Sequence, residues 1–283
     1  THARVYRCVC GTTMMMDTLP QHLLRRMYEP VPKESHIDLP EIDLFIVLGG
    51  PSALLLSRLF FWSLKQTTDL SGVTLHLINR DLTSEVFGEI ARLAPSAHYY
   101  SRPPVPSYYL TWCKNDMGRD VGWSCEWATM LGTKQFVVLS HFDVFFVKDF
   151  LTYLRKRITY RTGMLGQHCP IMLIKREALG QCHLRFRTAS PFYAVPHEEN
   201  PKQFYLYYEG DSRIPDNSPS TGFDMGELLE LELRVLGWHC DPMRRAMSAH
   251  FYHFTGGDRV HEGDELASIH RRAEMFIEEY AIP

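Results

Sequence analysis

From residue 42 onward, short apolar runs alternate with longer amphipathic runs. The apolar runs at 43–48 (DLFIVL), 73–78 (VTLHLI) and 136–140 (FVVLS) have the length and the β-branched or aromatic content of buried strands. The runs at 53–64 and 83–93 lie after the first two of these strands and predict helices. Strands and helices that alternate at this spacing predict an α/β fold, with a mostly parallel central sheet flanked by helices and joined by right-handed crossovers.

The rest of the chain continues this pattern in a second, more polar half. We expect a further strand at 171–174 and helices at 119–131, 150–158, 221–236 and 266–280, while residues 181–219 are polar and aromatic and are expected to form a long loop. No internal repeat, low-complexity tract or clear linker interrupts the sequence. We therefore expect a single domain over 1–283, with a ligand-binding half at about 42–180 and a closing half at about 181–283.

Composition narrows the class of protein. The chain has 283 residues, 45% of them hydrophobic and 22% charged, with a formal net charge of −3, which gives no general bias toward nucleic acid. Its seven cysteines are scattered without a C-x-x-C pair, so reduced thiols are expected. No apolar run approaches the roughly 18 residues that span a bilayer, and the first residues show no signal-type apolar region. We expect a soluble, cytoplasmic protein.

The stretch at 135–149, QFVVLSHFDVFFVKD, carries the strongest candidate chemistry. A buried strand runs directly into His141 and Asp143, and ligands of open α/β sheets bind beyond the carboxyl ends of the strands. A carboxylate in such apolar surroundings is costly unless a divalent cation or another group compensates its charge. An aspartate at this position is equally compatible with a turn that caps the following helix.

The order of these features resembles the GT-A fold nucleotide-sugar glycosyltransferases, in particular the family-2-like inverting enzymes. The resemblance rests on a first strand ending in a small-residue turn, a second ending at an acid, a central strand ending in x-x-D, a late D-x-x-E-L helix and a histidine near the C-terminus. It covers roughly 42–257 and implies a metal-dependent transfer of a sugar from a nucleotide-diphosphate donor to a hydroxyl of a glycan or another acceptor. The half at about 42–180 would then bind the nucleotide sugar, and the half at about 181–283 would bind the acceptor and close the site.

The resemblance implies a metal site. Asp143 matches the last acid of the Asp-x-Asp motif, which in this family binds Mn²⁺ or Mg²⁺ bridging the donor phosphates, whereas His141 replaces the first acid. His141 could contact the donor ribose or sugar, reach the metal through water, or be structural. His253, in HFYHFTGG, matches a C-terminal imidazole ligand on a closing loop; His250 could share a helical face with it or be an ordinary surface residue.

The resemblance also implies a catalytic base. Asp224 matches the acid at the start of the late helix, where a carboxylate takes the proton of the attacking acceptor hydroxyl, and Glu227 is the next candidate. A helix N-terminus would stabilise the ionised form of Asp224. The same position suits a simple helix cap.

Several further positions match the places where such enzymes hold the base and ribose. They lie in the turn after the first strand, after the second strand and at the start of the helix before the central strand, and they are Gly49, Gly50, Pro51, Asp81, Arg119 and Asp120. Gly-Gly-Pro is also an ordinary turn.

Three other functions use related chemistry. A nucleotidyltransferase would also use carboxylates and a metal ion to bind phosphates. A glycine-rich phosphate loop would favour this function, but the turn at 49–52 matches neither G-x-G-x-x-G nor G-x-x-x-x-G-K-[ST]. A hydrolase could hold zinc on His141, Asp143 and His253, but the sequence contains neither H-E-x-x-H nor another short-spaced zinc motif. A non-catalytic carbohydrate- or nucleotide-binding module would use the aromatic segment at 192–208, which in a transferase is a candidate for acceptor binding.

Overall fold

A computed structural model gives the fold of the protein. It describes residues 4–7, 13–16, 40–110, 116–166, 170–183, 185–186, 192–196, 204–208, 226–241, 243, 249–254 and 264–282. No helix in these ranges is long and apolar enough to cross a membrane.

Within the described residues, the centre of the molecule is a seven-stranded sheet. In spatial order its strands are β12 (His239–Asp241), β8 (Thr162–Leu165), β9 (Ile171–Lys175), β6 (Phe136–His141), β3 (Ile42–Leu48), β4 (Val73–Asn79) and β5 (His98–Ser101). All neighbouring pairs are parallel except those of β9, which runs antiparallel to both β6 and β8. The mostly parallel sheet expected from the sequence is therefore confirmed.

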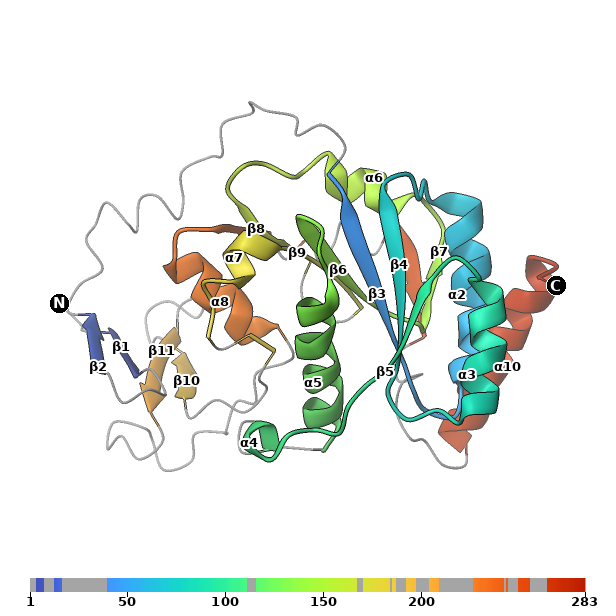
Figure 1. Ribbon diagram of the computed structural model, residues 1–283, viewed down its shortest axis with the longest axis horizontal. Coiled ribbons are helices and arrows are strands. Elements are labelled where there is room, and N and C mark those ends of the chain that lie inside the picture. Colours follow the sequence, from blue (N-terminus) through green and yellow to red (C-terminus); the bar gives the residue numbers. More distant parts are fainter. Residues whose placement is uncertain are drawn as a thin grey trace.

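Helices cover both faces of this sheet (Figure 1). One face carries α2 (Ala53–Thr67), α3 (Ser84–Leu93) and α10 (Asp264–Glu279); the other carries α5 (Asp116–Leu131), α7 (Arg176–Leu179) and α8 (Glu227–Val235). Two short helices, α4 (Ser107–Leu110) and α6 (Phe150–Arg155), lie in connections. The result is a three-layer α/β architecture.

The alternation of side chains along β3 explains why the strand is apolar throughout. Leu44 and Ile46 pack into the core shared with α2, whereas Phe45 packs into the core shared with α5, and all three are 0% exposed. A strand buried on both faces needs apolar residues at successive positions. This is the pattern that made β3 and β6 readable from the sequence.

Three two-stranded antiparallel sheets complete the described fold. They are β7 (Val144–Phe146) with β13 (Phe251–His253), β10 (Phe192–Pro196) with β11 (Phe204–Tyr208), and β1 (Arg4–Arg7) with β2 (Thr13–Met16). The first of these packs on α2, where the hydroxyl of Ser63 accepts a hydrogen bond from the Phe146 N–H.

Three expectations from the sequence need correction. The segment at 181–219, expected to be a loop, contains β10 and β11. The late helix expected at 221–236 begins only at Glu227, with Gly226 in a left-handed conformation before it. His253 lies on a strand, so it shares no helical face with His250. The short aromatic strands show no clear period in the sequence, so pairing decides their structure. The late helix begins after Gly226 because that residue has a positive φ of 93°.

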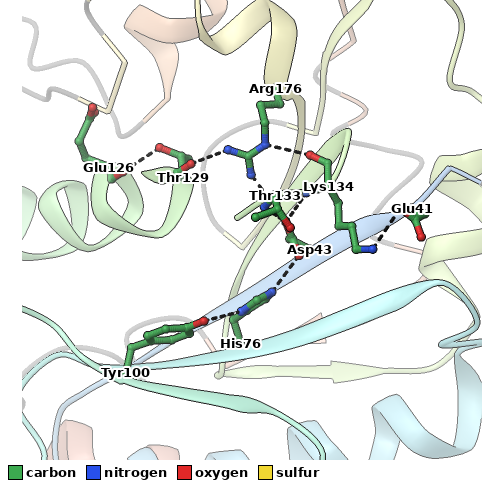
Figure 2. Close-up of polar contacts among 9 residues, drawn as sticks. All are labelled: Glu41, Asp43, His76, Tyr100, Glu126, Thr129, Thr133, Lys134 and Arg176. Carbon is green, nitrogen blue, oxygen red and sulfur yellow. Dashed lines mark hydrogen bonds and ion pairs between the residues drawn. The ribbon is translucent and has the colours of Figure 1, made fainter. Parts of the chain in front are cut away.

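A buried polar network fixes the amino-terminal end of β3 (Figure 2). The carboxylate of Asp43, 1% exposed, accepts hydrogen bonds from the backbone N–H groups of Thr133 (2.6 Å) and Lys134 (2.8 Å). The guanidinium of Arg176 is 3.6 Å from the same oxygen, Oδ2, and the other oxygen, Oδ1, lies 2.9 Å from Nε2 of His76. Both carboxylate oxygens are thus compensated by donors from β4, from the segment between α5 and β6, and from α7.

The neutral form of His76 suits this network. Burial lowers the pKa of the His76 imidazole below its usual value, although the hydrogen bond and charge of Asp43 oppose that shift. With Nε2–H donated to Asp43, Nδ1 can accept the hydroxyl of Tyr100 at 3.4 Å. The ring stacks on Phe45 with 4.2 Å between centroids, so the imidazole belongs to the core between sheet and α5.

Replacing Asp43 by alanine is expected to lower the free energy of unfolding by about 3–5 kcal/mol, because the buried partners of the carboxylate lose their acceptor. Glu41→Ala is the matched control: its carboxylate, 64% exposed, pairs with Lys134 at 3.0 Å, and such surface pairs contribute at most about 1 kcal/mol. Urea unfolding of the two variants measures the difference. Equal losses in both would contradict the structural role of Asp43.

Candidate metal and nucleotide site

The turn that follows β6 places two polar side chains at the carboxyl end of the central strand. His141 is the last residue of β6, and its N–H donates to the carbonyl of Pro170. Phe142, between the two polar residues, is 1% exposed and packs into the core with α2. This anchored phenylalanine fixes the turn, so that His141 and Asp143 are held by backbone and core rather than by each other.

The strand β13 brings the third member of the cluster from the C-terminal part of the chain. His253 pairs in register with Val144, and the N–H of Phe254 donates to the Asp143 carbonyl at 2.8 Å. At the other end of the ladder, the N–H of Val147 donates to the His250 carbonyl at 2.9 Å. Backbone pairing on both sides of His253 therefore determines its position next to Asp143.

The three side chains converge on one point. Ligand atoms of His141, Asp143 and His253 all lie within 4.8 Å of one another, which makes them a group that could hold a metal ion. Asp143 Oδ1 is 3.3 Å from Nε2 of His253 and 3.8 Å from Nδ1 of His141. The exposed side-chain fraction rises from 0% for Asp143 to 10% for His141 and 25% for His253, so the histidines lie on the solvent side of the carboxylate.

The burial of Asp143 is the observation that favours a cation. Neither carboxylate oxygen has a hydrogen-bond partner among the described residues, and Nε2 of His253 is likewise buried without one. An ionised carboxylate taken out of water without compensation costs several kcal/mol or more. Carboxylate oxygen and imidazole nitrogen are metal donors, and a divalent cation between them would satisfy these orphaned atoms together. The residues present therefore fit a metal ion.

A second cluster lies at the ends of the neighbouring strands β3 and β4. The carboxylate of Asp81 accepts the Gly50 N–H at 3.0 Å and the Nε–H of Arg80 at 3.0 Å. A Cβ at Gly49 would lie 2.5 Å from Arg80 Nε and 2.6 Å from Asp81 Oδ1, so a larger residue here would displace these two side chains. Gly50 has φ of 84°, which also favours glycine. The Gly-Gly turn and Asp81 are thus built as one unit.

Arg102 is a candidate that the sequence analysis missed. Its guanidinium is 8% exposed and donates from Nη2 to Asp120 at 3.2 Å, but its Nε and Nη1 are buried without a hydrogen-bond partner among the described residues. Burial lowers the pKa of the Arg102 guanidinium, and the charge of Asp120 opposes this shift. It lies directly after β5, at the same sheet edge as Asp81, and that position was the available signal.

The remaining expected residues are distributed as follows. Pro51 is exposed beside Gly50, and Asp120 is 44% exposed and paired with Arg102. Arg119 lies in α5 and Glu227 begins α8, but their side chains are outside the described part of the structure. Asp224 lies outside the described residues, so its role as a base stays a prediction, and α8 does not contain it.

No protein-family model and no curated protein matches the sequence. Similar solved structures include the mannosyltransferase PcManGT from Pyrobaculum calidifontis in complex with GDP-Man and Mn²⁺, at 10% identity and a TM-score of 0.40. The alignment covers 57% of this chain and 52% of that one, so the chain spans about half of the mannosyltransferase.

Two further similar structures have related names. They are the galactosyltransferase LgtC in complex with donor and acceptor sugar analogues (10% identity, TM-score 0.39, covering 50% of this chain and 60% of that one) and mouse xyloside xylosyltransferase 1 (9%, 0.37, 50% and 69%). These proteins are GT-A-type glycosyltransferases, the class that the sequence resembles.

Replacing Asp143 by asparagine is expected to remove the charge that would bind a metal ion while the fold is kept. In EDTA the variant should unfold at the same temperature as the wild type or higher, because a neutral amide removes a buried, unpartnered charge. With Mn²⁺ only the wild type should gain stability, by about 2.7 kcal/mol at 100 times Kd. Differential scanning fluorimetry measures both effects.

Asp149→Asn is the matched control for this experiment. Asp149 caps α6 by accepting the Thr152 N–H, and it lies outside the cluster. This variant should keep the full Mn²⁺ shift. An equal shift in Asp143→Asn would show that the ion binds elsewhere.

Proposed function

We propose that this protein is a metal-dependent glycosyltransferase that moves a sugar from a nucleotide-diphosphate donor to an acceptor hydroxyl. The observation that carries the proposal is the convergence of His141, Asp143 and His253 at the carboxyl end of β6, with the carboxylate buried and its oxygens without hydrogen-bond partners among the described residues. Open α/β sheets bind ligands at this edge. The site therefore has the position and the ligand atoms that would hold a divalent cation.

In this proposal the three cluster residues hold the cation, Mn²⁺ or Mg²⁺, and fix where the donor phosphates lie. Such an ion, when bound, supplies positive charge to the departing diphosphate. The carboxylate is positioned by Phe142 in the core, and His253 by the β7–β13 ladder. This prior positioning matters because a preorganised charge loses little energy to reorganisation during the reaction.

The nucleotide end of the donor would lie along the neighbouring strand ends. β6, β3, β4 and β5 are successive neighbours, so the cluster and Arg102 are separated by three strand spacings, about 14 Å. The turn at Gly49 and Gly50 packs closely against Arg80 and Asp81, which places the Asp81 carboxylate at this edge of the sheet. The buried N–H groups of Arg102 are donors for an acceptor atom of the ligand, and Asp81 and Asp120, both partly exposed, are acceptors for ribose hydroxyls or base N–H groups.

The proposed chemical step is an inverting displacement. The carboxylate of Asp224 takes the proton of the acceptor hydroxyl as that oxygen bonds to the anomeric carbon, and the nucleoside diphosphate leaves with the electrons of the broken C–O bond. Glu227, the first residue of α8, is the alternative base. The aromatic segment at 192–208 is our candidate for the acceptor side.

A panel of UDP-, GDP- and dTDP-sugars with and without Mn²⁺ tests the proposal. One donor class should raise the unfolding temperature only when the ion is present, because ligand bound to the folded state alone stabilises it. That donor should then be slowly hydrolysed, releasing nucleoside diphosphate and sugar. Release of pyrophosphate would indicate a nucleotidyltransferase, and the absence of a shift with every donor would contradict donor binding.

Replacing Arg102 by lysine is expected to weaken binding of that donor about tenfold or more, because lysine keeps the charge but loses the planar set of N–H donors. Isothermal titration with the donor and Mn²⁺ measures the change. Arg92→Lys, on the exposed side of α3, is the matched control and should bind as the wild type does. Unchanged affinity in Arg102→Lys would remove this residue from the site.

Replacing Asp224 by asparagine is expected to lower kcat for transfer by about 10²–10⁴-fold while the donor-induced thermal shift remains, since a general base acts only on the acceptor proton. Glu227→Gln is the comparison and should retain most of the activity. The opposite pattern would assign the base to Glu227. Full activity in both variants would show that neither residue is the catalytic base.

A further inference from the structure

The hydroxyl of Ser52 is not used by the helix that it precedes. Ser52 is the N-cap of α2, a position where a serine hydroxyl ordinarily accepts a backbone N–H of the first helical turn, but its side chain makes no such hydrogen bond. Its oxygen lies 3.3 Å from Nε2 of His270, which is 218 residues further along the chain, in α10. The side chain therefore joins two distant elements instead of capping its own helix.

The contact lies at the packed boundary between the two helices. α10 lies beside α2 (Figure 1), and its buried face includes Ile269 and Ala273, each 0% exposed. Ser52 is 1% exposed, and a buried hydroxyl needs a hydrogen-bond partner. The half-buried imidazole of His270, next to Ile269, supplies that partner. Apolar packing thus brings α10 to α2, and the polar contact fixes the residue at which α2 begins.

The turn before α2 links this contact to Asp81. The Gly50 N–H donates to the Asp81 carboxylate at 3.0 Å, and the Ala53 N–H donates to the Gly50 carbonyl at 3.3 Å. The turn is therefore held by Asp81 near its first half and by His270, through Ser52, near its second half. The Asp81 side chain is 45% exposed at the edge of the sheet where the proposed function places the nucleotide.

We propose that His270 is a positioning residue for nucleotide binding: through the Ser52 hydroxyl it holds the turn at 49–52, and through that turn the Asp81 carboxylate. The inference rests on the proposed function, because Asp81 is there an acceptor for the nucleotide. It gives α10 a role that is separate from the metal cluster, since the β7–β13 ladder places His253.

Preorganisation is the physical reason why this contact affects affinity. A segment that is already fixed loses little conformational freedom when a ligand binds, whereas a loose segment must be ordered at that moment. The turn contains two successive glycines, Gly49 and Gly50, and glycine has the largest backbone freedom to lose. Loss of the His270 contact should therefore weaken nucleotide binding, while the chemical groups that face the nucleotide stay the same.

Three variants of the complete chain test this role. His270→Leu and Ser52→Ala each remove one partner of the contact, whereas His270→Gln keeps an amide nitrogen close to the position of Nε2. The probe is whichever of UDP, GDP and dTDP gives the largest thermal shift with Mn²⁺, and isothermal titration measures its Kd. We expect Kd to rise about three- to tenfold in the first two variants, which corresponds to one hydrogen bond. The double variant should show no further rise, because both changes remove the same contact, and His270→Gln should restore most of the affinity.

Lys65→Met is the matched control. The Lys65 ammonium donates to the Leu93 carbonyl at 2.7 Å and so ties the other end of α2 to the end of α3. Its loss should leave Kd at the wild-type value. Two further measurements follow the turn and the metal cluster separately. Hydrogen exchange of the Gly50 amide should be faster in His270→Leu, and binding of Mn²⁺ alone, measured by electron paramagnetic resonance, should be unchanged.

The outcomes separate this inference from the proposed function. Unchanged Kd or unchanged Gly50 exchange in His270→Leu would overturn the positioning role and leave the proposed function in place, even if the unfolding temperature fell. An equal rise of Kd in Lys65→Met, or weaker Mn²⁺ binding in His270→Leu, would also overturn it, because α10 would then act on the whole fold. If none of the three nucleotides binds the wild type with Mn²⁺, the proposed function fails, and the role of His270 fails with it.

Discussion

The pairing of β7 with β13 is the interaction on which the candidate site depends. Without it, the turn after β6 would hold His141 and Asp143 but no third donor, because His253 belongs to a segment far along the chain. The ladder runs from the Phe254–Asp143 hydrogen bond through the register of His253 with Val144 to the Val147–His250 hydrogen bond. Its apolar side packs on α2, where Phe145 and Phe146 are each 1% exposed. Packing of β7 in the hydrophobic core thus fixes the backbone that places Asp143 and His253 next to each other.

Two buried carboxylates of this protein show how a structural acid differs from a candidate ligand. Asp43, 1% exposed, accepts two backbone N–H groups and an imidazole N–H, and Arg176 lies nearby (Figure 2). Asp143 is equally buried, yet neither of its oxygens has a hydrogen bond among the described residues. Since both side chains are at most 1% exposed, burial alone does not separate them. The accounting of donors does: the Asp43 carboxylate accepts hydrogen bonds from groups of the protein, whereas Asp143 Oδ1 faces two imidazoles, at 3.3 Å and 3.8 Å, without a hydrogen bond among the described residues.

The sequence was informative where one physical signal dominated. The apolar strands β3, β4 and β6 and the helices after the first two follow from hydrophobic period, and the position of Asp143 at a strand end follows from strand order. It was uninformative where pairing between distant segments decides the outcome. β13 has too few residues to show a period, and β10 and β11 read as polar and aromatic loop. Arg102 was missed because its significance lies in the burial of its Nε and Nη1, which only the packed structure reveals.

The three ligand residues come from two distant parts of the chain, so metal binding at the site depends on the packing of the C-terminal part. His141 ends β6 of the central sheet and Asp143 lies in the turn after it, whereas His253 belongs to β13. The helix α10 packs on α2 and places His270 Nε2 3.3 Å from the Ser52 hydroxyl. Ser52 lies directly after the Gly49–Gly50 turn, so both parts of the proposed donor site touch the same C-terminal region. A ligand that binds all three donors must stabilise the β7–β13 pairing by its own binding free energy.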